Sequence, residues 1–379
     1  MKLAYASTYD PRDIGAWSGL GTHILGALRD AECEVEVVMG STDRPSLVSL
    51  VKERTYRHAL SRNYLAEREP SVVRRNARRV ERALLSGSYD VLFSPGTLAT
   101  AFVQTDVPSV FWTDATFAGI TDFYPRYSHL CRESIREGNR IEASALSRCR
   151  LAIYSSEWAA GTALAHYDVD PAIVKVVPFG ANLECRRDLH DVAEIVRRRS
   201  QTVCKLLFLG VDWSRKGGEI ALAAATLLNQ RGVRAELHVV GCAPPIGVPG
   251  FVKIHGFVSK DTAQGRQRLD RMLAEAHFLI LPSRAECYGV VFAEASSFGL
   301  PSLATRVGGI PTAIRDGSNG QTFALDDGPE AYCDYIEGLW TDKAAYGKLC
   351  LSSFAEYSER LNWAVAGRTV RALMEEHCG

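Results

Sequence analysis

Short apolar runs alternate with longer helical stretches over most of the chain. The runs end in Gly, Ser, Pro or Asp, and near-continuous apolar runs of this kind are typical of strands buried on both faces of a sheet. A first series covers 2–8, 34–40, 90–95, 108–114, 151–156 and 174–180, and a second covers 204–210, 235–241, 252–258, 278–283 and 301–309. Helical patterns fill the gaps, for example at 216–231, 262–276 and 288–299. The alternation predicts an α/β protein with doubly wound parallel sheets.

The two series are separated at 181–203 by a polar, charged stretch that we interpret as an interdomain connection with a short helix. We therefore predict two Rossmann-like domains, at 1–185 and 200–360, facing each other across a cleft. Ligands of such sheets bind beyond the carboxyl ends of the strands, so the cleft is the expected site. A last helix is predicted at 361–379. The pattern leaves open on which domain it packs, the N-terminal domain being one alternative.

Composition narrows the class of protein. The chain has 379 residues, 23% of them charged, and a formal net charge of zero, so no global field favours nucleic acid. The ten cysteines form no CxxC pair or ligand-like cluster, and no apolar stretch approaches the roughly 20 residues of a membrane helix. The start does not resemble a secretory leader. We expect a cytoplasmic protein.

One stretch departs from this neutral balance. Residues 52–82 contain ten Lys or Arg against four Glu. Val73, Ala77, Val80 and Leu84 recur there at helical spacing, which predicts an amphipathic basic helix. One interpretation is a solvated face over a core stripe. The other is a docking surface for an anionic lipid, at the inner membrane face, or for a phosphate-bearing acceptor.

Candidate chemistry centres on two glutamates that stand eight positions apart. Glu286 follows the strand at 278–283, and Glu294 lies inside the next predicted helix. Eight residues amount to about 12 Å if helical throughout. The carboxylates of glycosidases lie roughly 5–9.5 Å apart, so an acid–base pair fits poorly. Gly289, at the helix start, would let a ligand approach the backbone, and free amides there favour an anion. Carboxylates at both ends with an anion site between them suit a sugar–diphosphate–ribose ligand.

The E-x7-E pattern after "PS", with an aromatic-Gly step between the glutamates, resembles the signature of the retaining glycosyltransferases of family 4, which have the GT-B fold. Four further stretches resemble that family in the same order along the chain. They are "WSGLGTHI" at 17–24, "VVPFGAN" at 176–182, "LGVDWSRKGG" at 209–218 and "VGGIPTAIRDGSNG" at 307–320. The similarity covers nearly the whole chain and is most specific between about 204 and 320.

This resemblance implies a role for each matching position. Glu294 would hold the ribose, and Glu286 would contact the transferred sugar with help from the backbone amides of Tyr288, Gly289 and Val290. Lys216, together with Arg215, would bind the diphosphate and stabilise the departing nucleotide. The loop at Phe257–Val258 would face the base, with Val258 counted among the donor-binding residues, and Gly21 would lie near the phosphate and the reacting sugar.

Two positions depart from the family pattern. Val211 stands where the family often has an arginine, which places more of the phosphate binding on Arg215 and Lys216. Thr113 stands where many members have a histidine near the transferred sugar, with Asp114 beside it. Asp114 is a catalytic candidate that binds the donor sugar or orients the acceptor; the alternative is a cap for the segment that follows.

The resemblance therefore implies an enzyme that moves a hexose from a nucleotide-diphosphate sugar to an acceptor hydroxyl of a glycan, a glycolipid or a small molecule. Glu286, Asp114 and Lys216 are its catalytic candidates, and neither a cofactor nor a metal is expected. Asp168-Val-Asp170 matches a metal-binding pattern of another fold, but it lies in a polar turn before Pro171. The alternatives are a silent sugar-nucleotide-binding subunit, a sugar-nucleotide epimerase or hydrolase of the same fold and, least favoured, a nicotinamide oxidoreductase.

Overall fold

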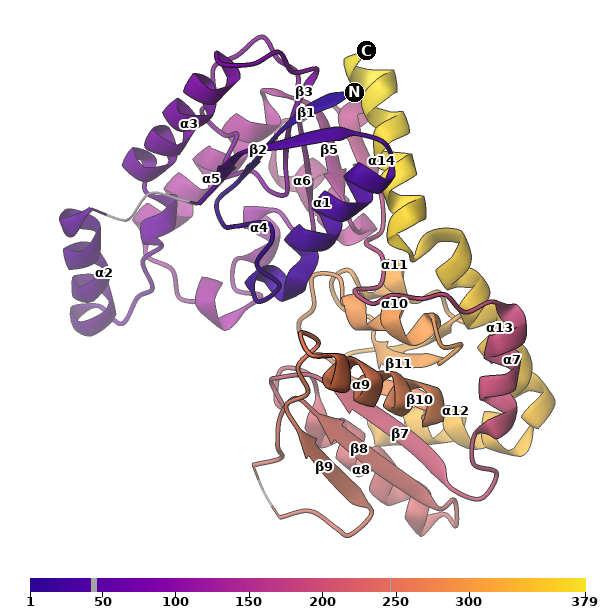
Figure 1. The fold of residues 1–379 in the computed structure, drawn as a ribbon. Coiled ribbons are helices and arrows are strands. Elements are labelled where there is room, and N and C mark those ends of the chain that lie inside the picture. The colour runs from indigo at the N-terminus through magenta and orange to yellow at the C-terminus, as the bar shows by residue number, and fades with distance from the viewer. Residues whose placement is uncertain (42–45, 246) are drawn as a thin grey trace. The chain divides into compact units, whose positions relative to one another are not determined.

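A computed structural model describes residues 1–41, 46–245 and 247–379. The chain divides into two compact units. The first comprises Met1–Pro178 and Trp363–Gly379, and the second comprises Phe179–Asn362. The last helix is thus part of the first unit. Each unit is built around its own six-stranded sheet (Figure 1).

The first unit contains a six-stranded parallel sheet in the order β2-β1-β3-β4-β5-β6. Its strands are β1 Lys2–Ser7, β2 Glu34–Gly40, β3 Val91–Ser94, β4 Ser109–Thr113, β5 Cys149–Tyr154 and β6 Val174–Val176. Its helices are α1 Leu20–Asp30, α2 Leu47–Ala59, α3 Pro70–Leu84, α4 Phe117–Ile120, α5 Arg132–Leu146, α6 Glu157–His166 and α14 Trp363–Cys378. The order reverses at β1, so right-handed connections place α1 on one face and α3, α5 and α6 on the other.

Helix α14 covers the same face as α1, with which it packs closely (Figure 1). A Cβ atom added at Gly367 would lie 2.3 Å from the carbonyl oxygen of Ala27, so the two helices touch backbone to backbone. Trp363, the first residue of α14, lies edge-on to the buried Trp112 of β4, with ring centroids 5.7 Å apart. Residues at the two ends of the sequence therefore build one core.

The second unit contains another six-stranded parallel sheet, in the order β12-β11-β10-β7-β8-β9. Its strands are β7 Cys204–Leu209, β8 Ala235–Val240, β9 Val252–Gly256, β10 Phe278–Leu281, β11 Ser302–Thr305 and β12 Gly320–Phe323. Its helices are α7 Leu189–Arg198, α8 Gly218–Gln230, α9 Ala263–Glu275, α10 Val290–Ser296, α11 Ile310–Ala313, α12 Pro329–Thr341 and α13 Lys343–Arg360. Helix α8 packs with α12, and α13 packs with α7 and α10.

These sheets confirm the predicted fold class, two doubly wound parallel α/β sheets. All eleven predicted strands are present, and the helices predicted at 216–231, 262–276 and 288–299 correspond to α8, α9 and α10. Strand β12 was missed, because its four residues, Gly-Gln-Thr-Phe, mix polar and small side chains. Within the described residues, no helix combines the length and the apolar character that crossing a bilayer requires.

Candidate functional site

The predicted donor-binding residues of the second unit lie in three loops at the carboxyl edge of its sheet and in helix α10, which follows one of these loops. Lys216 and Arg215 lie between β7 and α8, Glu286 between β10 and α10, and Val258 between β9 and α9, while Glu294 lies within α10. Strands β7 and β10 are neighbours at the point where the strand order reverses. Ligands of open α/β sheets bind beside such reversal points, so this edge is the candidate site.

The β7–α8 loop is held rigidly by its own contacts. The ring of Trp213 packs on Phe208 of β7 at 5.2 Å between centroids, and the carboxylate of Asp212 accepts a hydrogen bond from the Arg215 amide at 3.0 Å. Gly217 has φ of +74°, and a Cβ atom there would lie 1.9 Å from the carbonyl oxygen of Pro282. The two loops after β7 and β10 are therefore in van der Waals contact, and only glycine fits between them.

A buried ion pair joins these two loops. The ammonium of Lys216 contacts the carboxylate of Glu286, and both residues are buried. The guanidinium of Arg215 is 3.6 Å from the same carboxylate and donates to the carbonyl oxygen of Ala285 at 3.0 Å. Two cations thus converge on one carboxylate where little water reaches, so each charge depends on the others for compensation. This arrangement brings together three residues that the sequence predicted to share a ligand.

The second carboxylate has a separate partner. Glu294 is 1% exposed, and its carboxylate contacts the ammonium of Lys260, whose side chain is 37% exposed. Lys260 follows Val258 in the β9–α9 loop, and its carbonyl oxygen accepts a hydrogen bond from Arg266 at 2.8 Å. Sequence reasoning missed Lys260, although its place two residues after the loop predicted to face the base was a usable signal.

The structure adds two physical details to the sequence-based expectation. Glu286 lies in the loop, since α10 begins only at Val290, so continuous helical rise does not describe the separation of the two glutamates. Gly289 has φ of +86°, and a Cβ atom there would lie 2.4 Å from the ring of Phe292. Its backbone geometry and its packing against Phe292 therefore require glycine at this position, whether or not a ligand binds there.

Tyr288 is a buried anchor of the β10–α10 loop. Its hydroxyl donates to the carbonyl oxygen of Phe179 at 2.8 Å, and its ring lies edge-on to the ring of Phe179. Burial raises the pKa of the tyrosine hydroxyl. Its side chain is therefore committed to packing within the second unit, and only its backbone amide fits the predicted contact to a sugar.

In the first unit, Asp114 and Gly21 lie at the carboxyl edge of the sheet. Asp114 follows β4, and its carboxylate accepts a hydrogen bond from the indole of Trp17 at 3.2 Å. Trp17, Ser18 and Gly19 all have positive φ, which sets the turn into α1. A Cβ atom at Gly21 would lie 2.7 Å from the ring of Tyr9. Burial chiefly, and the charge of Asp114 in addition, raise the pKa of Tyr9.

The capping interpretation of Asp114 is excluded, because the cap of α4 is Thr116, whose hydroxyl accepts from the amide of Gly119 at 3.0 Å. Asp114 instead belongs to a group with Trp17 and Tyr9. The bond to Trp17 gives Asp114 a structural role in the turn before α1, and its contact with the donor sugar or its orienting role toward the acceptor stays a prediction.

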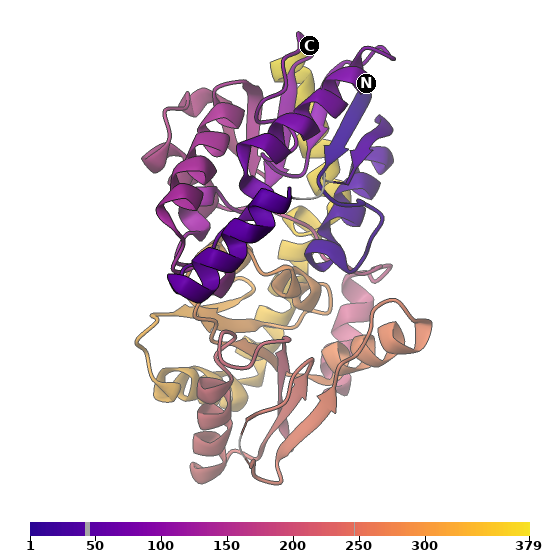
Figure 2. The same ribbon diagram turned by 90° about the vertical axis from the view of Figure 1, so that its left-hand side faces the viewer.

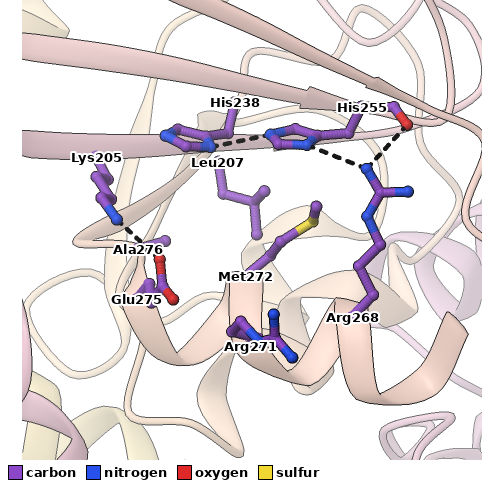
Figure 3. Close-up of a pocket in the computed structure, with 9 residues that line it drawn as sticks. All are labelled: Lys205, Leu207, His238, His255, Arg268, Arg271, Met272, Glu275 and Ala276. Atoms are coloured by element: carbon purple, nitrogen blue, oxygen red, sulfur yellow. Dashed lines mark hydrogen bonds and ion pairs between the residues drawn. The ribbon is translucent and has the colours of Figure 1, made fainter. Parts of the chain in front are cut away.

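A cavity of about 250 Å³ lies elsewhere in the second unit, between the sheet and α9 (Figure 3). His238 of β8 and His255 of β9 stack there with ring nitrogens 3.0 Å apart. Burial lowers the pKa of both imidazoles. None of the predicted site residues lines this cavity. It is therefore separate from the ion pair of Lys216 and Glu286.

Among the described residues, one cluster has the spacing of metal ligands, formed by Asp188, His190 and Asp191. All three are exposed, and the two aspartates form the capping box at the start of α7. This capping role explains why the two carboxylates lie close together.

Two protein-family models match the chain. Residues 19–184 match the model described as Glycosyltransferase Family 4, and residues 204–342 match the model described as Glycosyl transferases group 1. A D-inositol 3-phosphate glycosyltransferase of Streptomyces scabiei (strain 87.22) is 30% identical over 241 residues, which are 58% of this chain and 53% of that protein. One of Corynebacterium diphtheriae (strain ATCC 700971 / NCTC 13129 / Biotype gravis) is 26% identical over 225 residues, 55% of this chain and 52% of that protein. The chain thus spans about half the length of the curated relatives it matches.

Solved structures resemble the chain along nearly its whole length. Sucrose-phosphate synthase from Thermosynechococcus elongatus superposes with a TM-score of 0.71 at 14% identity, covering 99% of this chain and 98% of that one. Anabaena Alr3699/HepE in complex with UDP-glucose superposes with a TM-score of 0.63 at 15% identity, covering 99% and 100%. At these identities the likeness establishes the fold alone.

Proposed function

The chain belongs to the family 4 glycosyltransferases and has their GT-B fold, and from this premise we propose that it transfers a hexose from a nucleotide-diphosphate sugar to an acceptor hydroxyl, with retention at the anomeric carbon. The observation that carries the proposal is the convergence of Lys216 and Arg215 on Glu286 at the strand-order reversal. A diphosphate needs cations, and a hexose needs a carboxylate that accepts from its hydroxyls.

In the proposed mechanism, the diphosphate of the donor takes Glu286's place as the partner of Lys216 and Arg215. The carboxylate of Glu286 then turns to the hydroxyls of the hexose, and Glu294 accepts from the ribose hydroxyls. The bond between the anomeric carbon and the diphosphate oxygen breaks as the two cations stabilise the leaving charge. That oxygen takes the proton of the acceptor hydroxyl, whose oxygen bonds to the anomeric carbon on the same face.

No metal is required in this proposal, because Lys216 and Arg215 supply the positive charge that a divalent ion supplies in other transferases. From the first unit, Gly21 is proposed to contribute to donor binding, and Asp114 is proposed to act in catalysis by orienting the acceptor. The solved Anabaena protein binds UDP-glucose, so UDP-sugars are the first donors to test here. Inositol 3-phosphate is the first acceptor to test, after the names of the relatives.

The test begins with calorimetric titration of UDP-, GDP-, ADP- and dTDP-hexoses into the protein. We expect one nucleotide class to bind, and Glu294→Gln to weaken its binding by about ten- to a hundredfold, in line with the loss of a charge-assisted hydrogen bond from a buried group. Glu142→Gln is the matched control, because Glu142 is an equally buried carboxylate bonded to Thr97 in the first unit. Absence of binding by every sugar nucleotide, or equal loss in the control, would contradict the proposal.

Turnover separates the proposal from its alternatives. We expect Asp114→Ala to lower kcat while leaving the donor Kd within about threefold, and EDTA to leave the rate unchanged. Tight donor binding with no product from any acceptor would favour a silent binding subunit. Release of free hexose or of an epimerised donor without acceptor would favour the hydrolase or epimerase.

A further inference from the structure

The sheet of the second unit carries polar side chains on the face that lies toward α9. Strands of doubly wound sheets are buried on both faces and are usually apolar on both. In β8, however, Glu236 and His238 alternate with buried apolar residues. Lys205 and Leu207 of β7 are their partners in register, so all four side chains share this face. Polar side chains are unusual at such positions, which makes this face a candidate binding surface. The strands and α9 can be followed in a second view of the fold (Figure 2).

The cavity of about 250 Å³ lies on this face (Figure 3). From α9 it is lined by Arg268, Arg271, Met272 and Glu275, whose spacing places them on one side of the helix. Leu207 and Met272 give it apolar surface. Sites that take drug-sized ligands measure roughly 300–1,000 Å³. The cavity therefore suits a molecule smaller than a sugar nucleotide.

Two histidines that line the cavity form a hydrogen-bonded series with a fixed direction. Burial lowers the pKa of both imidazoles, so His238 and His255 are neutral near pH 7. An ionised carboxylate only accepts, so Nε2 of His238 donates to Glu236 at 3.2 Å. Nδ1 of His238 then accepts from Nε2 of His255 at 3.0 Å, and Nδ1 of His255 accepts from Nη2 of Arg268 at 3.4 Å. The series uses all four ring nitrogens and orients the guanidinium of Arg268.

Two arginines give the lining of the cavity a net positive charge. Arg268 and Arg271 lie three residues apart on α9, and among the residues that the structure describes neither has a carboxylate within ion-pair distance. Lys205 and Glu275 compensate each other at 2.8 Å. Figure 3 shows this pair on one side of the cavity and the guanidinium of Arg268 on the other. Guanidinium groups bind phosphate through paired N–H donors, so a phosphate is expected beside the arginines.

We propose that this cavity binds a small sugar phosphate. The phosphate lies between the guanidinium groups of Arg268 and Arg271. The C–H surface of the sugar packs on Leu207 and Met272, and the carboxylate of Glu275 accepts from sugar hydroxyls. The proposal does not depend on the proposed transferase activity, because no residue of the predicted donor site lines the cavity.

The experiment is calorimetric titration of the full chain with glucose 6-phosphate, inorganic phosphate and glucose at constant ionic strength. We expect glucose 6-phosphate to bind at a single site, inorganic phosphate to bind more weakly, and glucose not to bind at millimolar concentrations. Replacing both Arg268 and Arg271 with Gln should weaken glucose 6-phosphate binding at least about tenfold, because charge-assisted hydrogen bonds are lost. Both side chains are exposed, so thermal melting should not change.

A second variant separates the sugar contacts from the phosphate contacts. Glu275→Gln should weaken the binding of glucose 6-phosphate by about two- to tenfold, because the hydroxyls lose a charged acceptor. The same change should not weaken the binding of inorganic phosphate, because the charge that it removes is negative.

Two controls test whether the effect belongs to this cavity. Arg186→Gln combined with Arg234→Gln removes two exposed charges from the same unit, and neither residue lines the cavity. Lys216→Met tests the predicted donor site, where cations also lie beside a carboxylate. We expect both controls to bind glucose 6-phosphate within about twofold of the parent.

The proposal is overturned if glucose 6-phosphate does not bind at millimolar concentrations, or if the arginine variant and the arginine control lose equal affinity. Loss of binding in Lys216→Met, with none in the arginine variant, would assign the sugar phosphate to the donor site. Equal affinities for glucose 6-phosphate and inorganic phosphate would contradict the sugar contacts. None of these outcomes bears on the proposed transferase, which is tested by the titration of sugar nucleotides.

Discussion

Removing the charge of Lys216 is expected to destabilise the second unit, because the Glu286 carboxylate would stay buried with one cation 3.6 Å away. The side chains of Lys216 and Glu286 are 10% and 12% exposed. Removing one partner of a buried ion pair lowers the free energy of unfolding by about 3–5 kcal/mol. The guanidinium of Arg215 remains near Glu286 and offsets part of this loss. We therefore expect Lys216→Met to lower the free energy of unfolding by about 2–3 kcal/mol. Replacing both partners, as Lys216→Met with Glu286→Gln, should cost less than the sum of the single changes.

The assay is a double-mutant cycle measured by urea unfolding and followed by the intrinsic tryptophan fluorescence, to which Trp213, buried in the same loop, contributes. We expect a coupling energy of about 2 kcal/mol. The matched cycle uses Lys205 and Glu275 on the same unit, whose ion pair of 2.8 Å is 25% and 52% exposed. Exposed pairs contribute about 0–1 kcal/mol, so this cycle should show little coupling. Similar coupling in both cycles would refute the claim that burial makes the Lys216–Glu286 pair interdependent.

Two further predictions concern stability. Gly217→Ala should lower the free energy of unfolding by about 3 kcal/mol, because the alanine is held in a left-handed conformation and its Cβ atom clashes with the Pro282 carbonyl. Gly232→Ala, with φ of +89° and open space around it, should lower it by only about 1 kcal/mol. Equal losses in thermal melts would show that the clash does not contribute. Burial lowers the pKa of His277 to about 4, and the unfolded chain therefore takes up the proton first as pH falls below about 6.5. The free energy of unfolding should therefore fall by about 3 kcal/mol between pH 6.5 and 4. This pH dependence should be absent from the His277→Gln variant and present in the variant of an exposed histidine, His166→Gln.

The strands could be predicted because they are buried on both faces, which leaves a continuous apolar run in the sequence. Strand β12 could not, because Gly320 and Gln321 give it no such run. The convergence of Lys216, Arg215 and Glu286 was accessible because both loops follow neighbouring strands of the sheet. The contact between Lys260 and Glu294 depends on the course of a loop, which has no periodic signal.

Tertiary packing decided two other features. The partner of Asp114 is Trp17, which is 97 positions away and reached through a turn of three left-handed residues. The spacing of Leu47, Val48 and Val51 is that of a core stripe, yet the anchored face of α2 is the one with Ser49, Lys52 and Tyr56. A periodic pattern identifies an apolar helix face, but it does not determine whether the rest of the protein covers that face.

The position of α14 in the first unit determines when that unit can complete its folding during translation. Its residues follow the whole second unit in the chain, so α1 and Trp112 lack their cover until 363–379 have left the ribosome. At about 5–20 residues per second, translating the 184 residues of the second unit (362 − 178) takes roughly 10–40 s. During that interval the second unit can fold while one side of the first remains open. Nascent-chain chaperones would therefore meet the α1 face as the last apolar surface to close.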